Sequence, residues 1–260
     1  QYDEKRVGFN LRLGYEFNDI IRQSWFYTLS NREIYNVGTD ASRFIQEQVG
    51  TTLLSQIGQT LVYDRRDSRL EPKDGYIARL GTDFAGLGGD VHYVRVRVDG
   101  TLYVPLAPVT GVDDYIVVLA GSVGQLFSFD DNERIIDRYF LGGENLRGFR
   151  IGGAGPRDLS TGDSLGGRFI STASAEFRFP LPVPDDFGIT GRVFTDWGVL
   201  YGLSDTGPEV ADSKSPRGSV GFGVSWRTPF GLINIDLGYA VVKETYDRTE
   251  LLRFGFGTRF

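Results

Sequence analysis

The chain has 260 residues, a formal net charge of −6, and 35 glycines, 19 phenylalanines and 13 tyrosines, but no cysteine or methionine. The lack of cysteine excludes disulfides, thiolate metal sites and cysteine catalysis, and the negative net charge argues against phosphate contacts with nucleic acid. No stretch approaches the roughly 18 to 20 apolar residues of a membrane helix, whereas alternating apolar and polar residues leave a membrane-spanning β-barrel open.

Alternation of apolar and polar residues runs through most of the chain and predicts β-strands. Residues 7–15 set Val, Phe, Leu and Tyr against Gly, Asn and Arg, and the pattern returns in 94–104 and 218–227. In chain order, about eleven strands are expected, at 5–17, 22–35, 52–66, 75–86, 91–105, 114–128, 167–180, 189–202, 218–229, 231–243 and 250–260. The expected fold class is all-β and antiparallel.

Two features favour a transmembrane barrel over a soluble β-sandwich. The expected strands are about 10 to 15 residues long, whereas strands in globular proteins are most often about 5 or 6. Aromatic residues also gather at strand ends, as the interfacial girdles of a barrel require; they are Tyr103, Phe127, Phe179, Tyr201, Trp226 and Tyr239. Compact connections alternate with longer ones, which fits short periplasmic turns and long extracellular loops.

The last expected strand ends on an aromatic residue. One of its faces carries Leu252, Phe254, Phe256 and Phe260, and the other carries Arg253, Gly255, Gly257 and Arg259. Bacterial single-chain barrels have an even number of strands, so an odd number is not expected to be the whole object. The chain is therefore expected to be the C-terminal part of a barrel whose first strands lie upstream of Gln1.

No group of residues indicates catalysis. The single histidine, His92, has neither a nucleophile elbow nor a second metal ligand to accompany it, so we interpret it as structural. The glycine-rich stretches 86–90 and 152–158 lack the Lys-Ser/Thr pair and the helix start of a phosphate loop. Residues 129–134 lack the spacing of a calcium loop. We expect no catalytic residue, no metal site and no cofactor.

The central segment, RYFLGGENLRGFRIGGAGPRD at 138–158, holds six glycines and four arginines and has no apolar periodicity. Alternation in the two strands that follow places Glu176 and Asp196 on the polar face, where both would point into one interior. An unpaired carboxylate in a poorly hydrated interior is costly, and Arg147 could bind one through two parallel hydrogen bonds if Gly148 allows a tight tip. An outward loop with solvated interior charges explains these residues equally well.

The polar faces of these two strands contain further residues to which no partner is assigned. They are Ile170, Thr172, Ser174 and Arg178 in the first strand and Arg192, Phe194 and Gly198 in the second.

Several motifs, in this order along the chain, resemble the BamA/TamA/Sam superfamily of outer-membrane assembly factors. Residues 64–76 resemble its Asp-x-Arg-Asp…Pro-x-x-Gly turn. The signature of its sixth extracellular loop is matched by Leu146, Arg147, Gly148 and Phe149, and its Phe-x-Asp-x-Gly strand motif by Phe194, Asp196 and Gly198. Residues 155–167 and 177–189 are most similar to the alphaproteobacterial BamA type. Two departures are Leu146, where Val or Ile is usual, and Thr258, where a second aromatic residue is expected.

The resemblance implies a sixteen-stranded barrel preceded by POTRA repeats, of which residues 1–260 would supply the sixth to sixteenth strands. The sixth extracellular loop, at about 129–166, would fold inward, and Arg147 would pair there with Asp196 and Glu176. The first strands and the POTRA repeats would lie outside this chain.

The implied function is folding and insertion of β-barrel client proteins, without ATP, through a lateral gate between the first and last strands. The closing strand at this gate would include Arg253, Phe254, Gly255, Phe256, Gly257 and Phe260. Implied partners are outer-membrane lipids, unfolded β-barrel clients and accessory assembly lipoproteins, with no nucleic acid and no enzymatic activity. A two-partner secretion translocator, which shares the loop, and a passive porin, which lacks it, are the alternatives.

Overall fold

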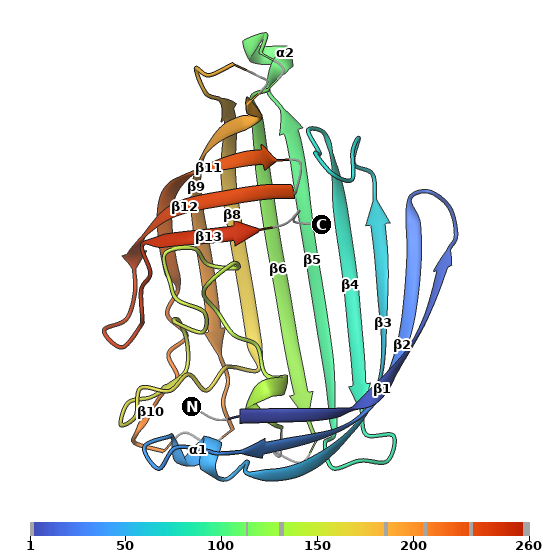
Figure 1. Cartoon of the computed structure of the whole chain (residues 1–260), viewed down its shortest axis with the longest axis vertical. Coiled ribbons are helices and arrows are strands. Elements are labelled where there is room, and N and C mark those ends of the chain that lie inside the picture. The colour runs from blue at the N-terminus through green and yellow to red at the C-terminus, as the bar shows by residue number, and fades with distance from the viewer. Residues whose placement is uncertain are drawn as a thin grey trace.

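The structure, a computed structural model, describes residues 3–112, 114–129, 133–184, 187–204, 207–228 and 231–256. Its main element is one antiparallel sheet of eleven strands (Figure 1). In sheet order they are β1 (Asp3–Glu16), β2 (Ile21–Tyr35), β3 (Gly50–Asp64), β4 (Gly75–Ala85), β5 (Tyr93–Pro105), β6 (Ile116–Ser128), β8 (Phe169–Pro180), β9 (Ile189–Tyr201), β11 (Arg217–Thr228), β12 (Gly231–Val242) and β13 (Leu252–Phe256). The predicted all-β fold and the eleven strands are confirmed.

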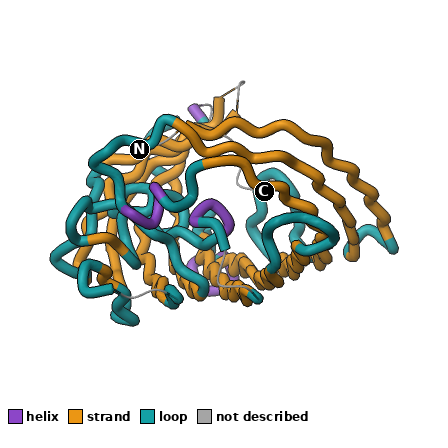
Figure 2. Tube along the Cα trace, turned by 90° about the horizontal axis from the view of Figure 1, so that it is seen from below, coloured by secondary structure: helices purple, strands orange, loops and turns teal. Residues whose placement is uncertain are grey.

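Consecutive strands of this sheet pair with each other along the chain, so the sheet is an up-and-down meander. The β1–β2 register runs from Asp3↔Tyr35 to Glu16↔Arg22 without interruption. Viewed from one end, the sheet curves around an interior in which loop segments lie (Figure 2). β1 and β13 are the two edges and do not pair with each other within the described residues.

Six of the predicted strand starts differ from the observed ones by two residues, and other contacts of the backbone explain two of these, at β5 and β13. β5 begins at Tyr93 rather than 91, because Asp90 turns back to β3: its N–H donates to the Leu53 carbonyl at 2.9 Å, and its carboxylate accepts from the Leu53 N–H at 2.7 Å. β13 begins at Leu252 rather than 250, because the Glu250 N–H donates to the Gly148 carbonyl instead of to β12. The predicted strand residues 257–260 lie outside the described residues.

The short elements were not predicted from sequence. They are the helices α1 (Arg43–Gln46) and α2 (Ala107–Thr110), the 3₁₀ turn η1 (Ile135–Asp137), and the two-residue strands β7 (Arg157–Asp158) and β10 (Val210–Ala211), which pair with each other. Tertiary contacts hold them: the Ser42 hydroxyl before α1 donates to the Asp158 carboxylate of β7 at 2.6 Å. No helix in the described ranges is long and apolar enough to cross a membrane.

The two faces of the sheet differ as the alternation predicts. On β9, Val193 and Trp197 are 44% and 42% exposed, whereas Arg192 and Asp196 are buried at 5% and 2%. On β12, too, an apolar residue, Tyr239, is exposed and a charged residue, Asp236, is buried. An apolar outer face and a charged inner face are typical of a barrel that spans lipid.

The main core lies between the inner face of the sheet and the segment that connects β6 to β8. Leu141, Leu146, Phe149 and Ala154 of this segment are fully buried. They pack in one cluster with residues from the strands, which are Leu54, Ala85, Tyr93, Leu126, Ile170, Leu200 and Ala240. The connecting segment therefore takes the place that a second sheet occupies in a β-sandwich.

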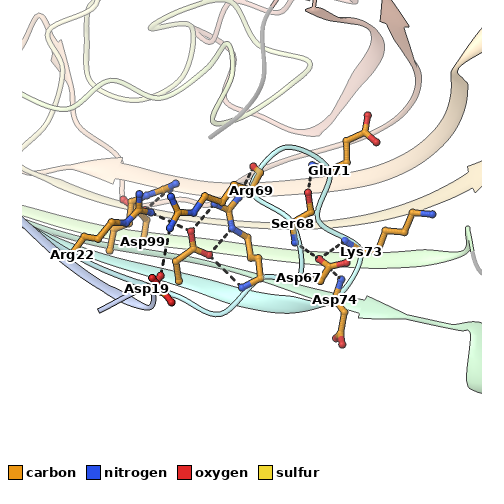
Figure 3. Close-up of polar contacts among 12 residues, drawn as sticks. Asp19, Arg22, Asp67, Ser68, Arg69, Glu71, Lys73, Asp74 and Asp99 are labelled. Carbon is orange, nitrogen blue, oxygen red and sulfur yellow. Dashed lines mark hydrogen bonds and ion pairs between the residues drawn. The ribbon is translucent and has the colours of Figure 1, made fainter. Parts of the chain in front are cut away.

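The turn between β3 and β4, which carries the Asp-x-Arg-Asp motif, is held by its own side chains (Figure 3). The Asp67 carboxylate accepts from the N–H groups of Ser68, Lys73 and Asp74 at 2.8, 3.0 and 3.2 Å. At its start, the Arg66 guanidinium binds both carboxylate oxygens of Asp64, at 2.8 and 2.9 Å. These contacts account for the Asp and Arg positions of the motif.

Candidate functional site: a loop clamped to the inner wall

Arg147 is the centre of the candidate site. It lies in the segment between β6 and β8, and its side chain is only 2% exposed. Its Nε and Nη2 donate to the two Asp196 carboxylate oxygens at 2.7 and 2.8 Å, and its backbone N–H donates to the same carboxylate at 3.1 Å. Its Nη1 donates to Glu176 Oε2 at 2.6 Å. The structure thus brings together the loop arginine and both carboxylates singled out from the sequence.

The inner wall prepares this position with two further groups. The Ser174 hydroxyl of β8 donates to Asp196 Oδ1 at 2.6 Å, which fixes the carboxylate from the side of the wall. The Phe194 ring of β9 lies beneath the guanidinium, with the Arg147 Cζ atom 3.4 Å from the ring centroid. A cation over an aromatic face is stabilised by about 0.5 to 2 kcal/mol, more when water is excluded. The Phe of the Phe-x-Asp-x-Gly motif thus contacts the cation that the Asp binds.

The ion pair extends into a larger charged cluster that is buried except for Arg178, whose side chain is 31% exposed. Arg178 Nε donates to Glu176 Oε1 at 2.9 Å, and Arg192 Nε donates to Asp236 Oδ1 at 2.9 Å. Asp236 Oδ1 also lies 3.9 Å from Arg147 Nη1. Three arginines and three carboxylates from β8, β9, β12 and the loop therefore neutralise one another inside the wall.

Burial and charge act in opposite directions on Arg147. Burial by itself would lower the pKa of the Arg147 guanidinium, but the hydrogen bonds and charges of Asp196 and Glu176 outweigh burial and raise its pKa above the ordinary arginine value. The guanidinium therefore carries a permanent charge, and removing it would leave two buried carboxylates without their main partner.

Glycine at two facing positions lets the loop tip reach the wall. Gly148 has φ of +88°, a conformation that residues with a Cβ rarely adopt, and a Cβ there would lie 3.1 Å from the Ser219 Cβ atom. On the wall, a Cβ on Gly238 of β12 would lie 2.7 Å from the Gly148 nitrogen. The backbones of loop and wall are therefore in direct contact beside Arg147.

Gly198, the glycine of the strand motif, makes a second close approach possible. A Cβ at Gly198 would lie 2.7 Å from Leu141 Cδ1, and Leu141 is fully buried at the base of the same loop. The three defined positions of the Phe-x-Asp-x-Gly motif therefore all contact the loop, since Phe194 and Asp196 hold Arg147 and Gly198 receives Leu141.

The loop tip also pairs with the segment that precedes β13. Phe149 and Thr249 form an isolated antiparallel bridge. The Arg150 N–H donates to the Arg248 carbonyl at 3.0 Å, and the Arg248 N–H donates to the Gly153 carbonyl at 2.8 Å. The tip is therefore bound on one side to the wall and on the other to the approach to the last strand.

The remaining predicted site residues lie on β13 or beyond it. Phe254 and Phe256 are exposed on the outer face, opposite Ile235 and Ile233 of β12, and Arg253 points the other way and is half-buried. Gly255 pairs with Asn234. Gly257 and Phe260 lie outside the described residues. β13 does not take part in the cluster around Arg147.

Sequence reasoning missed Asp236 and gave no partner to Arg178 or Arg192. Alternation in 231–242 does place Asp236 on the polar face, so the same pattern that found Glu176 and Asp196 was available for it. It also missed Arg217 and Asp247, which form a buried ion pair with Nε to Oδ2 at 3.1 Å. Asp247 lies in a loop without periodicity, so no sequence signal pointed to that pair.

No described group of three or more His, Cys, Asp or Glu side chains has the arrangement of a metal site. His92 immediately precedes β5, and its carbonyl accepts a hydrogen bond from the Phe129 N–H at 3.1 Å.

An up-and-down sheet with an apolar outer face, and a charged inner face that binds a loop, defines the class of outer-membrane β-barrel proteins. All of residues 1–260 match the model of the Omp85 superfamily domain, and the chain belongs to that superfamily. Its localisation is accordingly the bacterial outer membrane.

Two curated relatives show how far the similarity extends. The outer membrane protein assembly factor BamA of Neorickettsia risticii is 32% identical over 260 residues, which is 100% of this chain and 34% of that protein. The sorting and assembly machinery component 50 homolog B of Xenopus laevis is 33% identical over 246 residues, or 88% of this chain and 50% of that protein. The chain thus spans about a third to a half of the length of these relatives, whose names describe assembly rather than a chemical reaction.

Among solved structures, BamA from Haemophilus ducreyi lacking POTRA domains 1–3 superimposes with a TM-score of 0.84 at 20% identity. The match covers 97% of this chain and 54% of that one. The curved sheet described above therefore has the same fold as the matched part of that BamA structure.

Proposed function

We propose that the protein containing this chain folds and inserts β-barrel client proteins into the outer membrane. The observation that carries the proposal is the buried clamp in which Arg147 joins the inward loop to Asp196 and Glu176. Similarity over the whole chain to a protein named as an assembly factor supports it. We further infer that the chain forms the C-terminal part of a larger barrel, since its match covers only 34% of the length of that relative.

The clamp has a mechanical role in this proposal. Strands β8, β9 and β12 each contribute a carboxylate to the cluster, so the loop arginine holds a section of wall together from inside. A passive pore requires no such brace, and the loop core formed by Leu141, Leu146 and Phe149 occupies interior space that a porin leaves to water. The braced wall would keep its curvature while a neighbouring seam opens.

The seam in this proposal lies at β13. In the described residues, β13 is an edge of the sheet and pairs with β12 from Leu237↔Leu252 to Ile233↔Phe256. An edge strand presents unpaired backbone groups to which a client strand can add by β-augmentation. The lateral gate, unfolded β-barrel clients, outer-membrane lipids and accessory lipoproteins belong to this proposal, which requires no bond-making chemistry, ATP or cofactor.

The test replaces Arg147 by Ala in the full-length protein and measures assembly of heat-modifiable barrel clients after depletion of the parent. Leaving Asp196 and Glu176 buried without their cation costs about 3 to 5 kcal/mol, so client assembly is expected to fail. Arg147→Lys retains the charge but not the two parallel hydrogen bonds, and is expected to restore assembly only in part.

Arg227→Ala is the matched control, because the Arg227 side chain is 64% exposed at the far end of β11. Assembly in this variant should equal that of the parent. Full assembly by a correctly folded Arg147→Ala variant would contradict the proposal, and open-pore conductance without client assembly in the parent would favour a porin.

A further inference from the structure

Arg217 is a second fully buried arginine, at the first residue of β11, and it has no part in the Arg147 cluster. Its Nε donates to Asp247 Oδ2 at 3.1 Å, and its Nη2 donates to the Tyr246 hydroxyl at 3.1 Å. Its Nη1 donates to the carbonyls of Ser213 and Ser215 at 3.1 and 2.7 Å. One guanidinium thus joins the segment before β11 to the segment 243–251 that connects β12 to β13.

The Asp247 side chain is itself fully buried and is held from its own segment as well. Its Oδ2 accepts from the Glu244 N–H at 2.8 Å, and its backbone N–H donates to the Glu244 carbonyl at 3.2 Å. Arg217 and Glu244 therefore fix Asp247 in a closed turn. A buried carboxylate with a charged partner and a backbone donor is costly to move.

The residues that follow Asp247 are bound on their other side by the loop tip. Arg248 makes two backbone hydrogen bonds, to Arg150 and Gly153, and the Glu250 N–H donates to the Gly148 carbonyl at 3.0 Å. The next residue but one is Leu252, the first residue of β13. The approach to β13 is thus held between Arg217 on one side and the Arg147-anchored tip on the other. In Figure 1, the loop between β6 and β8 lies beside β13.

Geometry links this anchor to the position of the strand. Leu252 is five residues beyond Asp247, which is at most about 17 Å of extended chain. β13 is an edge of the sheet within the described residues, so only β12 supplies ladder hydrogen bonds to it there. An edge strand that begins next to a fixed point is positioned by that point as well as by its pairing with one neighbour.

From this geometry we propose that Arg217 is a positioning residue for β13. By fixing Asp247, it holds residues 248–250 against the loop tip and so sets where the last strand starts. This deepens the proposed function, on which its link to client insertion rests, because β13 is the strand at which clients would enter.

The test measures the position of β13 by pulsed EPR in the full-length protein. Val193, Phe222, Leu237 and Leu252 lie opposite one another across β9, β11, β12 and β13. Spin labels on Val193→Cys and Leu252→Cys would therefore be separated by three inter-strand spacings, about 14 Å at the backbone. Both side chains are 44% exposed on the outer face, and residues 1–260 contain no other cysteine to react.

We expect Arg217→Gln to broaden this distance distribution and to shift it to longer distances. Asp247→Asn, which removes the charge but keeps the shape, should have the same effect and remains informative if Arg217→Gln does not fold. Arg227→Gln, at the exposed end of the same strand, should leave the distribution unchanged. An unchanged distribution in folded Asp247→Asn would overturn the proposal.

Client insertion provides the second readout. Couplings carried through packed elements correspond to roughly twofold to thirtyfold changes in rate, and a loss in this range is expected for Arg217→Gln. A disulfide between Arg150→Cys and Arg248→Cys, two exposed residues joined by a backbone hydrogen bond, should restore insertion if the anchor acts only by position. Failure of the disulfide to restore it would count against the proposal. A parent that inserts no clients would refute the proposed function, while the EPR result would still decide the role of Arg217.

Discussion

The loop covers the inner wall at β8 and β9 and leaves it open at β4 and β5, although both halves follow the same alternating pattern. Where the loop meets β8 and β9, the side chains of its Arg147 and of Asp196 on β9 are only 2% and 4% exposed. At β4 and β5, the Arg79–Asp99 pair, with Nη1 to Oδ2 at 3.4 Å, has side chains 30% and 29% exposed and borders a cavity of about 470 Å³. The difference is that the loop covers the first pair and not the second, so burial by the loop makes a lumenal ion pair structural.

The largest expected effect comes from removing one carboxylate in each half. Asp196→Ala leaves Arg147 buried with half its partners and should lower the free energy of unfolding by about 3 to 5 kcal/mol. Asp99→Ala removes a half-exposed partner and should cost no more than about 1 kcal/mol. Urea unfolding in detergent micelles, followed by heat modifiability on gels, measures both. Equal costs would show that the loop cover does not make the difference.

A smaller effect is expected from adding one methyl group to each half. Gly198→Ala would press on Leu141 of the loop and should cost about 1 to 3 kcal/mol, the usual range for an overpacked core. At Gly81, on β4 in the half that the loop leaves open, the nearest atom to an added Cβ is 3.9 Å away, so Gly81→Ala should be close to neutral. Leu141→Ala combined with Gly198→Ala should cost less than the sum of the two single changes, because the shorter side chain removes the clash. The midpoint of urea unfolding measures both costs. A loss of stability in Gly81→Ala as large as in Gly198→Ala would contradict the difference between the two halves.

The smallest effect should appear only on acidification. Burial alone would raise the pKa of Glu133, at the base of the loop, but the Arg168 hydrogen bonds and the Arg138 charge outweigh burial and lower it. Because the pKa of Glu133 is lowered, the ionised carboxylate stabilises the folded state at pH values above its ordinary pKa of 4.5. This contribution disappears as the pH falls through the folded-state pKa.

The free energy of unfolding, measured from pH 7 to pH 3, should therefore fall more steeply in the parent than in Glu133→Gln below pH 4.5. The gap between the two should be constant above that pH. A gap that stays constant down to pH 3 would mean that Glu133 gains nothing from its two arginines.

Much of this protein follows from local rules in the sequence. Period-two alternation depends only on neighbouring residues, and it predicted all eleven sheet strands and the inward direction of Glu176 and Asp196. It errs where a segment has a partner far along the chain, as at Glu250, whose N–H bonds to Gly148 instead of extending β13. The Arg-Gly-aromatic stretch was visible as unusual, but chemistry alone left its direction open.

Only the tertiary structure decided which charges are buried and which contacts hold the last strand. Arg79 lies on the wall at β4 and stays 30% exposed, whereas Arg147 lies on the loop, whose path carries it against the wall and buries it. The Arg217–Asp247 pair joins two connecting segments that have no periodicity. Burial depends on which residues surround a side chain in space. The burial of Arg147 and the Arg217–Asp247 pair therefore could not be predicted from the neighbouring residues along the chain.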